Sequence, residues 1–438
     1  MSILRRAPND RPAPRSTKST ANSDGPMLPP GELDSLDELE KADRTAILRR
    51  GVDLGPIFKG MAFGDLCICI VGLQRSRRFL LEHSERLLPR TLDLKPLVPN
   101  GFLRQMSGET HTHYRRAIVR ASRALDPIVD QAVLDTIVAS GLSQLVAASG
   151  DDVNGPSPLL EIASSTATAE LIALFFGVAP GSDVFSRLVR GYQRLGPYGL
   201  VWNLAEPQFE AFAEIKAELR AELSRFGQGQ ATMSDACVLG QLVGDGEVDD
   251  TMLGNLIYMV EMGRYDMAIF FRWLIRYAAA NPNAMARVAT EIAMGPTPPS
   301  KMSAAESFVL EVLRSDQAER LMREALCDLT FDNYLIPKGA FVRVCVWESH
   351  HSPDSFTDPY RFDPERFLRT TPTNDQFSPF GIDNHQCPFG GLSIRLGITL
   401  VRALATAFRT TTVTDGRPIR GAYHWEPSRK LRVNVTHR

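Results

Sequence analysis

Cys387 is the residue of this chain whose surroundings point most clearly to chemistry. It ends a turn-rich loop, residues 377–386, and comes shortly before a segment, 391–408, whose apolar residues recur at helical spacing. A thiol just before a helix meets the partial positive charge and the unsatisfied N–H groups of the helix N-terminus. Both favour the thiolate, the form that binds metal ions. The pattern indicates a metal-binding thiolate, and the alternative is a buried structural cysteine.

The loop around Cys387 resembles the haem-ligand loop of cytochromes P450, which reads Phe-Gly-x-Gly-x-His/Arg-x-Cys-x-Gly. Phe380, Gly381, His385 and Cys387 occupy the matching places. The resemblance implies that Cys387 is the axial ligand of a haem b iron (iron protoporphyrin IX) and that Phe380 and His385 contact the cofactor. A thiolate ligand pushes electron density toward O–O cleavage.

Two positions of the loop depart from the family pattern. Asp383 stands where the family has its second glycine, and Phe389 stands two places after the cysteine, with Gly390 one place late. Glycine tolerates turns and close contacts that larger residues resist. We therefore expect some loss of turn flexibility and of close approach between backbone and sulfur.

A second motif supplies a charged triad. Glu311 and Arg314 are three residues apart, where side chains on one helix face can pair. Such a pair alone has little meaning, but Arg366 follows in the segment Phe-Asp-Pro-Glu-Arg-Phe, ahead of Cys387. In the family these three residue types form a buried triad that supports the cysteine loop. The resemblance implies a structural role, in which the loss of one member is severe.

A third group consists of cations suited to the two haem propionates, which need donors in a low-dielectric pocket. The segment around His111 and Arg115 resembles the His-Thr-x-x-Arg-Arg of bacterial P450s. Arg323 lies where the family has another propionate-binding arginine, and His385 is the fourth candidate. The alternative is a solvated basic face. Zinc binding by His111 and His113 lacks further ligands at a usable spacing.

The segment 251–282 occupies the place of the helix that crosses the distal haem face in P450s. Counted back from Pro282, the usual Gly-x-Asp/Glu-Thr becomes Gly263-Arg264-Tyr265-Asp266, so the acid-alcohol pair is missing. Asp266, Tyr265 and Arg264 are therefore the candidate catalytic residues. We expect Asp266 to relay protons, satisfied by Arg264, Tyr265 or water. The alternatives are a contact to a polar substrate group and mere pocket shape.

The patterns predict a mainly α fold with minor β. Helical spacing dominates from about residue 126 to 290, while strand patterns occur only at 65–73 and 340–347. Residues 1 to about 40, rich in Arg, Pro and Ser, are predicted to be disordered. Residues 41–438 are predicted to form a single domain. The resemblance implies the P450 fold, with haem buried between the distal helix and the proximal cysteine loop.

Composition excludes several partners. The chain has 438 residues, 44% hydrophobic and 23% charged, as is typical of globular proteins, and its net charge of −2 gives no reason to expect nucleic acid. Six scattered cysteines favour a reducing cytoplasm over a disulfide framework. The sequence contains no uninterrupted run of 18 apolar residues, so neither export nor a membrane anchor is expected.

Together the motifs predict an enzyme, a P450-type oxidoreductase of the soluble bacterial type. The expected reaction is monooxygenation of a small organic molecule or specialised metabolite, with electrons from a ferredoxin and its reductase or an equivalent partner. Because the acid-alcohol pair is missing, the alternative is a haem-thiolate enzyme without the usual proton relay: peroxide-driven oxygenation, oxidative coupling or cyclisation, or rearrangement. A non-catalytic haem-binding protein is the third possibility.

Overall fold

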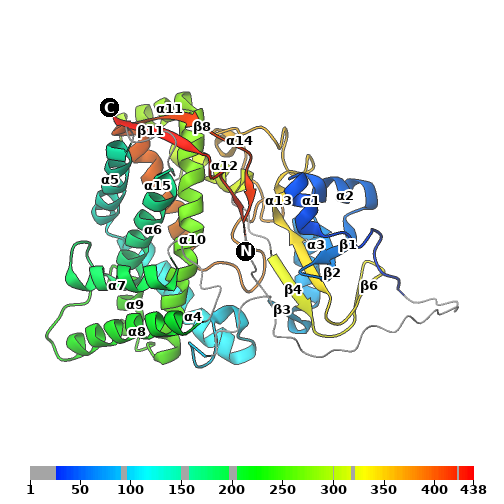
Figure 1. Ribbon diagram of the computed structural model, residues 1–438, viewed down its shortest axis with the longest axis horizontal. Helices are drawn as coiled ribbons and strands as arrows, with labels where there is room; N and C mark the ends of the chain where they lie inside the picture. The colour runs from blue at the N-terminus through cyan, green and yellow to red at the C-terminus, as the bar shows by residue number, and fades with distance from the viewer. Residues whose placement is uncertain are drawn as a thin grey trace. The chain divides into compact units, whose positions relative to one another are not determined.

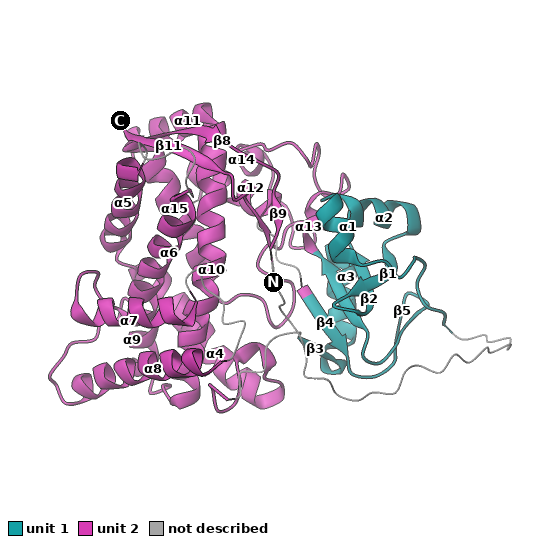
Figure 2. Cartoon of the chain, in the orientation of Figure 1, with its two compact units in different colours: residues 1–90, 322–345 teal, residues 91–321, 346–438 magenta. Residues whose placement is uncertain are grey.

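The computed structural model describes residues 26–89, 96–148, 157–196, 205–298, 300–316, 321–421 and 424–438. The chain divides into two compact units (Figure 2), the smaller one formed by residues 1–90 and 322–345 and the larger one by residues 91–321 and 346–438. The prediction of a single domain over residues 41–438 stays a prediction.

The smaller unit is built on one mixed sheet of strand order β1-β2-β7-β4-β3. Strands β1 and β2 pair antiparallel, β2 and β7 pair parallel, and β3 and β4 pair antiparallel. Its elements are α1 (Leu36–Ala42), α2 (Ala46–Leu54), β1 (Ile57–Ala62), β2 (Asp65–Val71), α3 (Leu73–Glu82), η1 (Ser84–Arg86), β3 (Leu87–Pro89), β4 (Leu321–Ala325), β5 (Leu329–Phe331), β6 (Tyr334–Ile336) and β7 (Phe341–Cys345). The strands predicted at 65–73 and 340–347 are thus β2 and β7.

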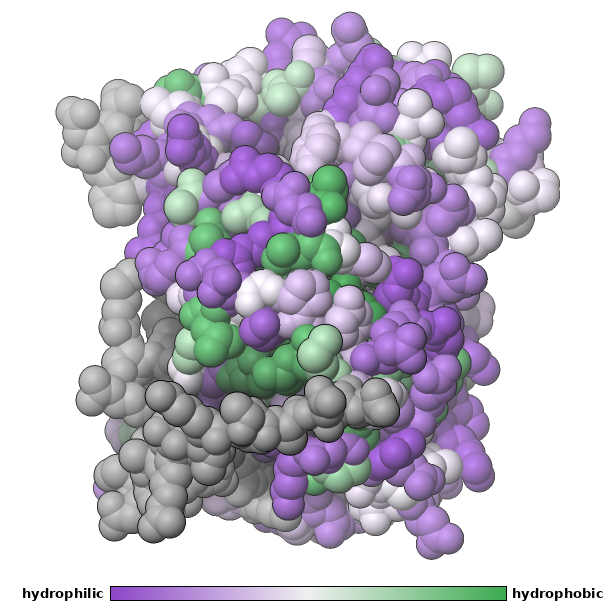
Figure 3. All heavy atoms as spheres, turned by 90° about the vertical axis from the view of Figure 1, so that its right-hand side faces the viewer, coloured by the Kyte–Doolittle hydropathy of each residue, from purple (hydrophilic) through white to green (hydrophobic). Residues whose placement is uncertain are grey.

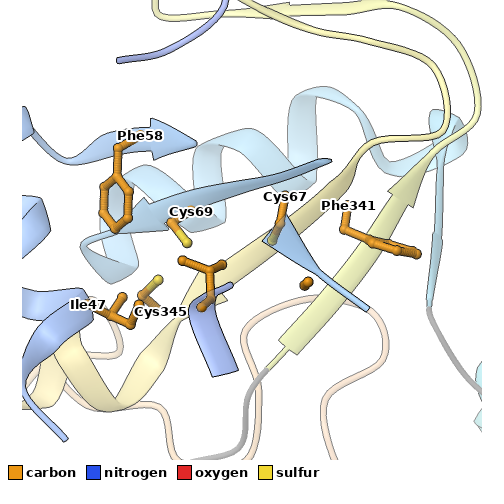
Figure 4. Packing of buried hydrophobic residues seen from close by; sticks show 8 residues of the cluster. Ile47, Phe58, Cys67, Cys69, Phe341 and Cys345 are labelled. Carbon is orange, nitrogen blue, oxygen red and sulfur yellow. The ribbon is translucent and has the colours of Figure 1, made fainter. Parts of the chain in front are cut away.

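Three cysteines belong to the core of the smaller unit. Cys67 and Cys69 on β2 and Cys345 on β7 are fully buried and pack with Phe58 and Phe341 (Figure 4). Burial raises the pKa of the Cys69 thiol well above its usual value. All three side chains are enclosed by apolar residues, so these cysteines serve packing.

The larger unit is mostly helical, and Figure 1 shows α10 running through it with α6 and α15 alongside. Its helices are η2 (Leu103–Gln105), α4 (Gly108–Leu125), η3 (Asp126–Ile128), α5 (Gln131–Ala148), α6 (Leu159–Phe176), α7 (Asp183–Leu195), α8 (Glu206–Gly227), α9 (Val238–Gly244), α10 (Asp250–Ala280), α11 (Pro282–Ala293), α12 (Ala304–Ser315), α13 (Val346–His350), α14 (Arg366–Arg369) and α15 (Gly390–Thr406). Its strands are β8 (Phe408–Thr414), β9 (Ile419–Arg420), β10 (Trp425–Glu426) and β11 (Arg432–His437). The predicted mainly α fold with a minor sheet component is confirmed.

Helix α10 is a core helix with defined ends. The Asp249 side chain caps its start by accepting from the Met252 N–H at 2.7 Å. The helix ends at Ala280, and Pro282 begins α11. At the first position of a helix no backbone N–H is needed for an intrahelical bond, so proline fits there. Most of the residues between are buried, so α10 is fixed in position along its length.

Two helices of this unit, α5 and α6, are long and apolar enough to cross a membrane by length and composition alone. In α6, 72% of the apolar stretch Leu159–Phe176 is buried, and α6 packs along α10. Core packing accounts for the apolar character of α6, so this signal is weak evidence for a membrane.

The segment predicted to be disordered, residues 1 to about 40, lies partly within the described residues. Residues 1–25 lie outside the described residues. Regular structure begins at Leu36, which is 1% exposed, and Glu40 on the same helix pairs with the buried Arg343 at 2.8 Å. Helix α1 thus begins a few residues before the boundary predicted near residue 40, and the disorder predicted for residues 1 to about 40 stays a prediction.

Several large apolar side chains of the smaller unit reach the surface. Figure 3 shows a mostly hydrophilic face on which hydrophobic residues gather near the centre. Exposed apolar residues of this unit are Met27, Leu28, Leu33, Val52, Phe63, Leu81, Leu88 and Leu326.

Candidate active site

The cysteine loop is closed by its own backbone. The Cys387 N–H donates to the Phe380 carbonyl at 2.9 Å, and Gly381 adopts φ +97°, a conformation that favours glycine. Helix α15 begins three residues after Cys387, and no side chain caps its first turn. The predicted position of the thiol near a helix N-terminus is confirmed, and both Cys387 and Phe380 line a cavity in the larger unit.

The two departures from the family loop have local explanations. The Asp383 carboxylate accepts from the His385 N–H at 2.8 Å, and the Asp383 carbonyl accepts from the Gln386 N–H at 3.0 Å, so this residue stabilises the turn. Phe389 packs on Phe175 with ring centroids 4.7 Å apart. A Cβ at Gly390 would come within 2.9 Å of the Phe380 ring, so the glycine one place late still provides a close approach.

Two histidines and an arginine meet beside the cysteine loop. The rings of His111 and His385 lie 4.6 Å apart, and Arg115 Nη2 donates to the Gln386 carbonyl at 2.8 Å. The His111, Arg115 and His385 side chains line the cavity together with Cys387. Burial is the main cause that lowers the pKa values of His111 and of Arg115.

These residues fit a haem. His111 Nε2 is buried, and among the described residues it has no hydrogen-bond partner. A buried polar atom without a partner is costly, which a propionate oxygen would relieve. A thiol, an arginine and two histidines around one cavity can supply the ligand and the hydrogen-bond donors that an iron porphyrin with two carboxylates requires.

Arg323, the fourth predicted propionate partner, lies on β4 of the smaller unit and is 3% exposed. Its contact with haem stays a prediction.

One face of α10 lines the cavity. Met259, Met262, Gly263, Asp266, Met267 and Phe270 recur at intervals of three and four residues along it. Asp266 is therefore presented to the same cavity as Cys387, as predicted from the count back from Pro282.

Arg264 and Tyr265 do not line this cavity, which argues against the catalytic roles predicted for them. Arg264 precedes Asp266 by two residues, which places the two side chains about 200° apart around the helix. It is 1% exposed, and its Nε donates to Glu261 Oε2 at 2.8 Å, while Nη2 donates to the Tyr192 carbonyl at 2.6 Å and to that of Gly196. The Tyr265 hydroxyl donates to Glu426 Oε1 at 2.7 Å. Both residues tie α10 to other elements.

One partner of Asp266 is His424, a residue that sequence reasoning missed. His424 Nε2 lies 3.1 Å from Asp266 Oδ1, and His424 also lines the cavity. The expected partners were Arg264, Tyr265 or water. No spacing in the sequence points to His424, because 158 positions separate the two residues and only the fold brings them together.

The predicted triad forms as expected. Arg314 pairs with both oxygens of Glu311 at 2.7 and 2.8 Å, and Arg366 Nε lies 3.1 Å from Glu311 Oε2. Glu311 and Arg314 are fully buried, and Arg366 is 7% exposed. Arg314 also donates to the His350 carbonyl at 3.0 Å, while the His350 ring accepts from the Ser378 N–H at 3.1 Å. The triad is thereby connected to the start of the cysteine loop.

Comparison with known proteins agrees with this geometry. A family model described as cytochrome P450 matches residues 248–395. Abscisic acid 8'-hydroxylase 1 of Arabidopsis thaliana is 26% identical over 398 residues, covering 83% of this chain and 80% of that protein. The abscisic acid 8'-hydroxylase of Solanum lycopersicum is 24% identical over 438 residues, covering 92% and 90%.

Solved structures share the fold. The retinoic acid-bound cyanobacterial CYP120A1 matches with a TM-score of 0.69 and 23% identity, over 94% of this chain and 100% of that chain. Cytochrome P450EX alpha with myristic acid matches with a TM-score of 0.69 and 18% identity, also over 94% and 100%. Similarity at this level shows the fold alone.

A helical unit that presents a cysteine loop across a cavity from one long helix defines the class of haem-thiolate proteins. Within that class, the family match over residues 248–395 and the shared fold support membership of the cytochrome P450 superfamily, and the hydroxylases named above support a monooxygenase activity. The family uses a haem iron cofactor, a substrate and redox partners.

Proposed function

We propose that this protein is a haem b monooxygenase that acts on a small, mainly apolar organic molecule, such as a specialised metabolite. The observation that carries the proposal is the cavity bounded by Cys387 and by the face of α10 that bears Asp266. Phenylalanine, leucine, methionine and proline side chains make up most of its wall, and such walls favour apolar ligands.

Each residue at the cysteine loop has an assigned part in this proposal. Cys387 provides the thiolate ligand, and His111, Arg115 and His385 hold the propionates, with Arg323 as a fourth partner. The bound haem supplies the activation of dioxygen that thiolate ligation favours. The protein holds the ring in place, excludes water with its apolar wall and positions the substrate against it.

The altered segment of α10 supports a second candidate. Because the acid-alcohol pair is absent and Arg264 points elsewhere, a reaction without the usual proton relay is the alternative: peroxide-driven oxygenation, coupling or cyclisation, or rearrangement. Asp266 is the carboxylate on this face of α10, so it serves either as the proton relay or as a substrate contact.

We propose a ferredoxin and ferredoxin reductase as the electron source, a cytoplasmic location and no membrane association. These proposals rest on the resemblance to soluble bacterial P450s. The relatives named above as hydroxylases support oxygen insertion as the reaction, while abscisic acid belongs to their names and not to this chain.

The test compares two sources of oxidising equivalents. Purified haem-loaded protein is incubated with candidate apolar substrates and either NAD(P)H with a ferredoxin system or hydrogen peroxide alone. Oxygenated product formed with the ferredoxin system, carrying label from ¹⁸O₂, supports the proposal. Product with peroxide alone supports the second candidate, and no product under either condition with a bound substrate contradicts both.

A further inference from the structure

The Asp266–His424 pair is the feature of the cavity that neither the family loop nor the triad explains. The carboxylate comes from the middle of α10, and the imidazole comes from the residue just before β10. Both side chains line the cavity, and they lie 3.1 Å apart. About 39% of the Asp266 side chain is exposed, against 7% of His424, so the carboxylate is the more accessible member.

His424 is held in place by bonds from α10 to the residues that follow it. Trp273 Nε1 donates to the Trp425 carbonyl at 2.9 Å, and Arg272 Nη2 donates to the carbonyls of Pro427 and Ser428 at 3.0 and 3.2 Å. Two neighbouring side chains of α10 thus bind the backbone of residues 425, 427 and 428. A hydrogen-bonding group on a fixed element orients a ligand more precisely than one on a mobile loop.

The pair stands in an apolar wall. The apolar residues that line the cavity are Phe102, Leu103, Leu171, Phe175, Met259, Met262, Met267, Phe270, Leu313, Pro379, Phe380, Pro388 and Phe389. In such a site a few polar groups decide the orientation of the ligand.

The other polar groups of the wall lie in different places. His111, Arg115 and His385 gather at the cysteine loop, and the Ser393 hydroxyl donates to the Phe389 carbonyl at 3.1 Å. Arg104 follows Leu103, whose N–H donates to the Asn255 side chain at 2.7 Å. Asn255 precedes Asp266 by three helical turns, about 16 Å along the axis.

We propose that Asp266, positioned by His424, recognises a hydrogen-bond donor on an otherwise apolar substrate, such as a hydroxyl group. An ionised carboxylate only accepts hydrogen bonds, and a bond to an ionised acceptor is roughly twice as strong as a neutral one. His424 Nε2 lies 3.1 Å from Oδ1, and this contact fixes the orientation of the carboxylate at the cavity wall. A substrate carboxylate at this point meets a like charge, which costs binding free energy. The site therefore selects alcohols over the matching acids. This inference rests on the proposed function, because it assigns the substrate class of the same cavity.

The test measures binding without turnover. Three probes of equal chain length are titrated into ferric haem-loaded protein: tetradecan-1-ol, its methyl ether and myristic acid. Dissociation constants come from the change in the haem absorption spectrum and, independently, from equilibrium dialysis. We expect the alcohol to bind at least about tenfold tighter than the ether or the acid, the effect of one charge-assisted hydrogen bond.

Substitutions locate the preference. Asp266→Asn should weaken the binding of the alcohol and strengthen the binding of the acid, because the substitution removes the negative charge. His424→Phe should reduce the preference for the alcohol, and His424→Gln, which keeps a donor toward Asp266, should restore much of it. Met262→Leu serves as the matched control in the same wall and should change all three constants by a similar factor. Should His424→Phe lose haem, Asp266→Asn and His424→Gln still decide the question.

Several outcomes would overturn the inference. These are failure of the alcohol to bind, tighter binding of the acid, or unchanged constants in Asp266→Asn. Unchanged binding together with less product per NAD(P)H and more peroxide release would assign Asp266 to proton relay instead. Because binding is measured in the ferric protein, a failed oxygenation assay would refute the proposed function separately.

Discussion

The Ser378 N–H donates to the ring Nε2 of His350, and this bond joins the start of the cysteine loop to the residue whose carbonyl accepts from Arg314. His350 is fully buried, and burial lowers its pKa to about 3, so its ring is neutral and available as an acceptor. One residue thus connects the charged triad to the loop that presents Cys387.

His350→Phe should loosen the cysteine loop while the triad stays intact, because the backbone carbonyl to Arg314 remains. The buried Ser378 N–H loses its acceptor, which costs about 1–3 kcal/mol. We expect faster haem loss to apomyoglobin and an unchanged helical circular dichroism spectrum. His350→Gln, whose side-chain oxygen can accept, is the control and should lose haem more slowly. Equal rates in both variants would show that this bond does not support the loop.

Glu311→Ala should be severe, since it leaves Arg314 and Arg366 buried without their carboxylate. Breaking a buried pair by removing one partner costs about 3–5 kcal/mol. We expect insoluble or haem-free protein. The control is Glu218→Ala, which removes the partner of Arg187 in an exposed pair and should cost less than about 1 kcal/mol. A soluble, haem-loaded Glu311→Ala with altered products would mean that the triad is misassigned.

Cys387→Ser should abolish the red-shifted absorption band of the ferrous carbon monoxide complex, because serine provides no thiolate. Cys327→Ser, which removes another free cysteine, is the matched control and should keep the band. Retention of the band in Cys387→Ser would refute Cys387 as the iron ligand.

Arg115→Ala and His111→Ala should weaken haem retention without changing the thiolate spectrum of the haem that remains. Each removes a donor for a propionate, and Arg115→Ala also removes the bond to the Gln386 carbonyl. The exposed neighbour Arg116 provides the control substitution, Arg116→Ala. The measurement is the haem-to-protein ratio after gel filtration. Full occupancy in both single variants and in the double variant would contradict the assignment.

Glu261 should make stability depend on pH. Burial raises its pKa to about 7, against a usual value of 4.5, although Arg264 opposes the shift. Between these two values the folded carboxyl keeps a proton that the unfolded chain releases. The free energy of unfolding therefore falls as pH rises from about 4.5 to about 7, by up to about 3 kcal/mol.

The Glu261→Gln variant has no titratable side chain at this position, so its stability lacks this pH dependence. Denaturant unfolding of both proteins at several pH values should show the wild type losing stability relative to the variant across that window and no further change above it. A pH-independent difference between the two proteins would contradict the shift.

The parts of the site that follow from local spacing could be predicted from the sequence. The cysteine before α15, the triad and the cavity-facing position of Asp266 depend on positions close in sequence or on a motif order. The direction of Arg264 was available from helical periodicity, because it lies about 200° around α10 from Asp266. Arg264, Tyr265 and Asp266 are adjacent in the sequence, but they point in different directions around the helix, and of the three only Asp266 lines the cavity.

His424 could not be predicted by such reasoning. Its position depends on the bonds that Arg272 and Trp273 make to backbone carbonyls of residues 425–428. Backbone carbonyls are the same at every residue, so a sequence contains no sign of which ones a side chain will reach. The two-unit division of the chain likewise depends on contacts between distant segments.

Residues 424–428 are bonded to α10, and this arrangement separates the residues that would contact the substrate from those that suit the haem. The residues around Cys387 that suit the haem belong to α4 and the cysteine loop, whereas His424 belongs to the last fifteen residues of the chain. Exchange of this terminal segment between homologous proteins would therefore retune which molecules are accepted while the cofactor pocket is inherited unchanged. The segment 424–428 is accordingly a suitable place to vary residues when the substrate preference is to change and the cofactor contacts are to stay the same.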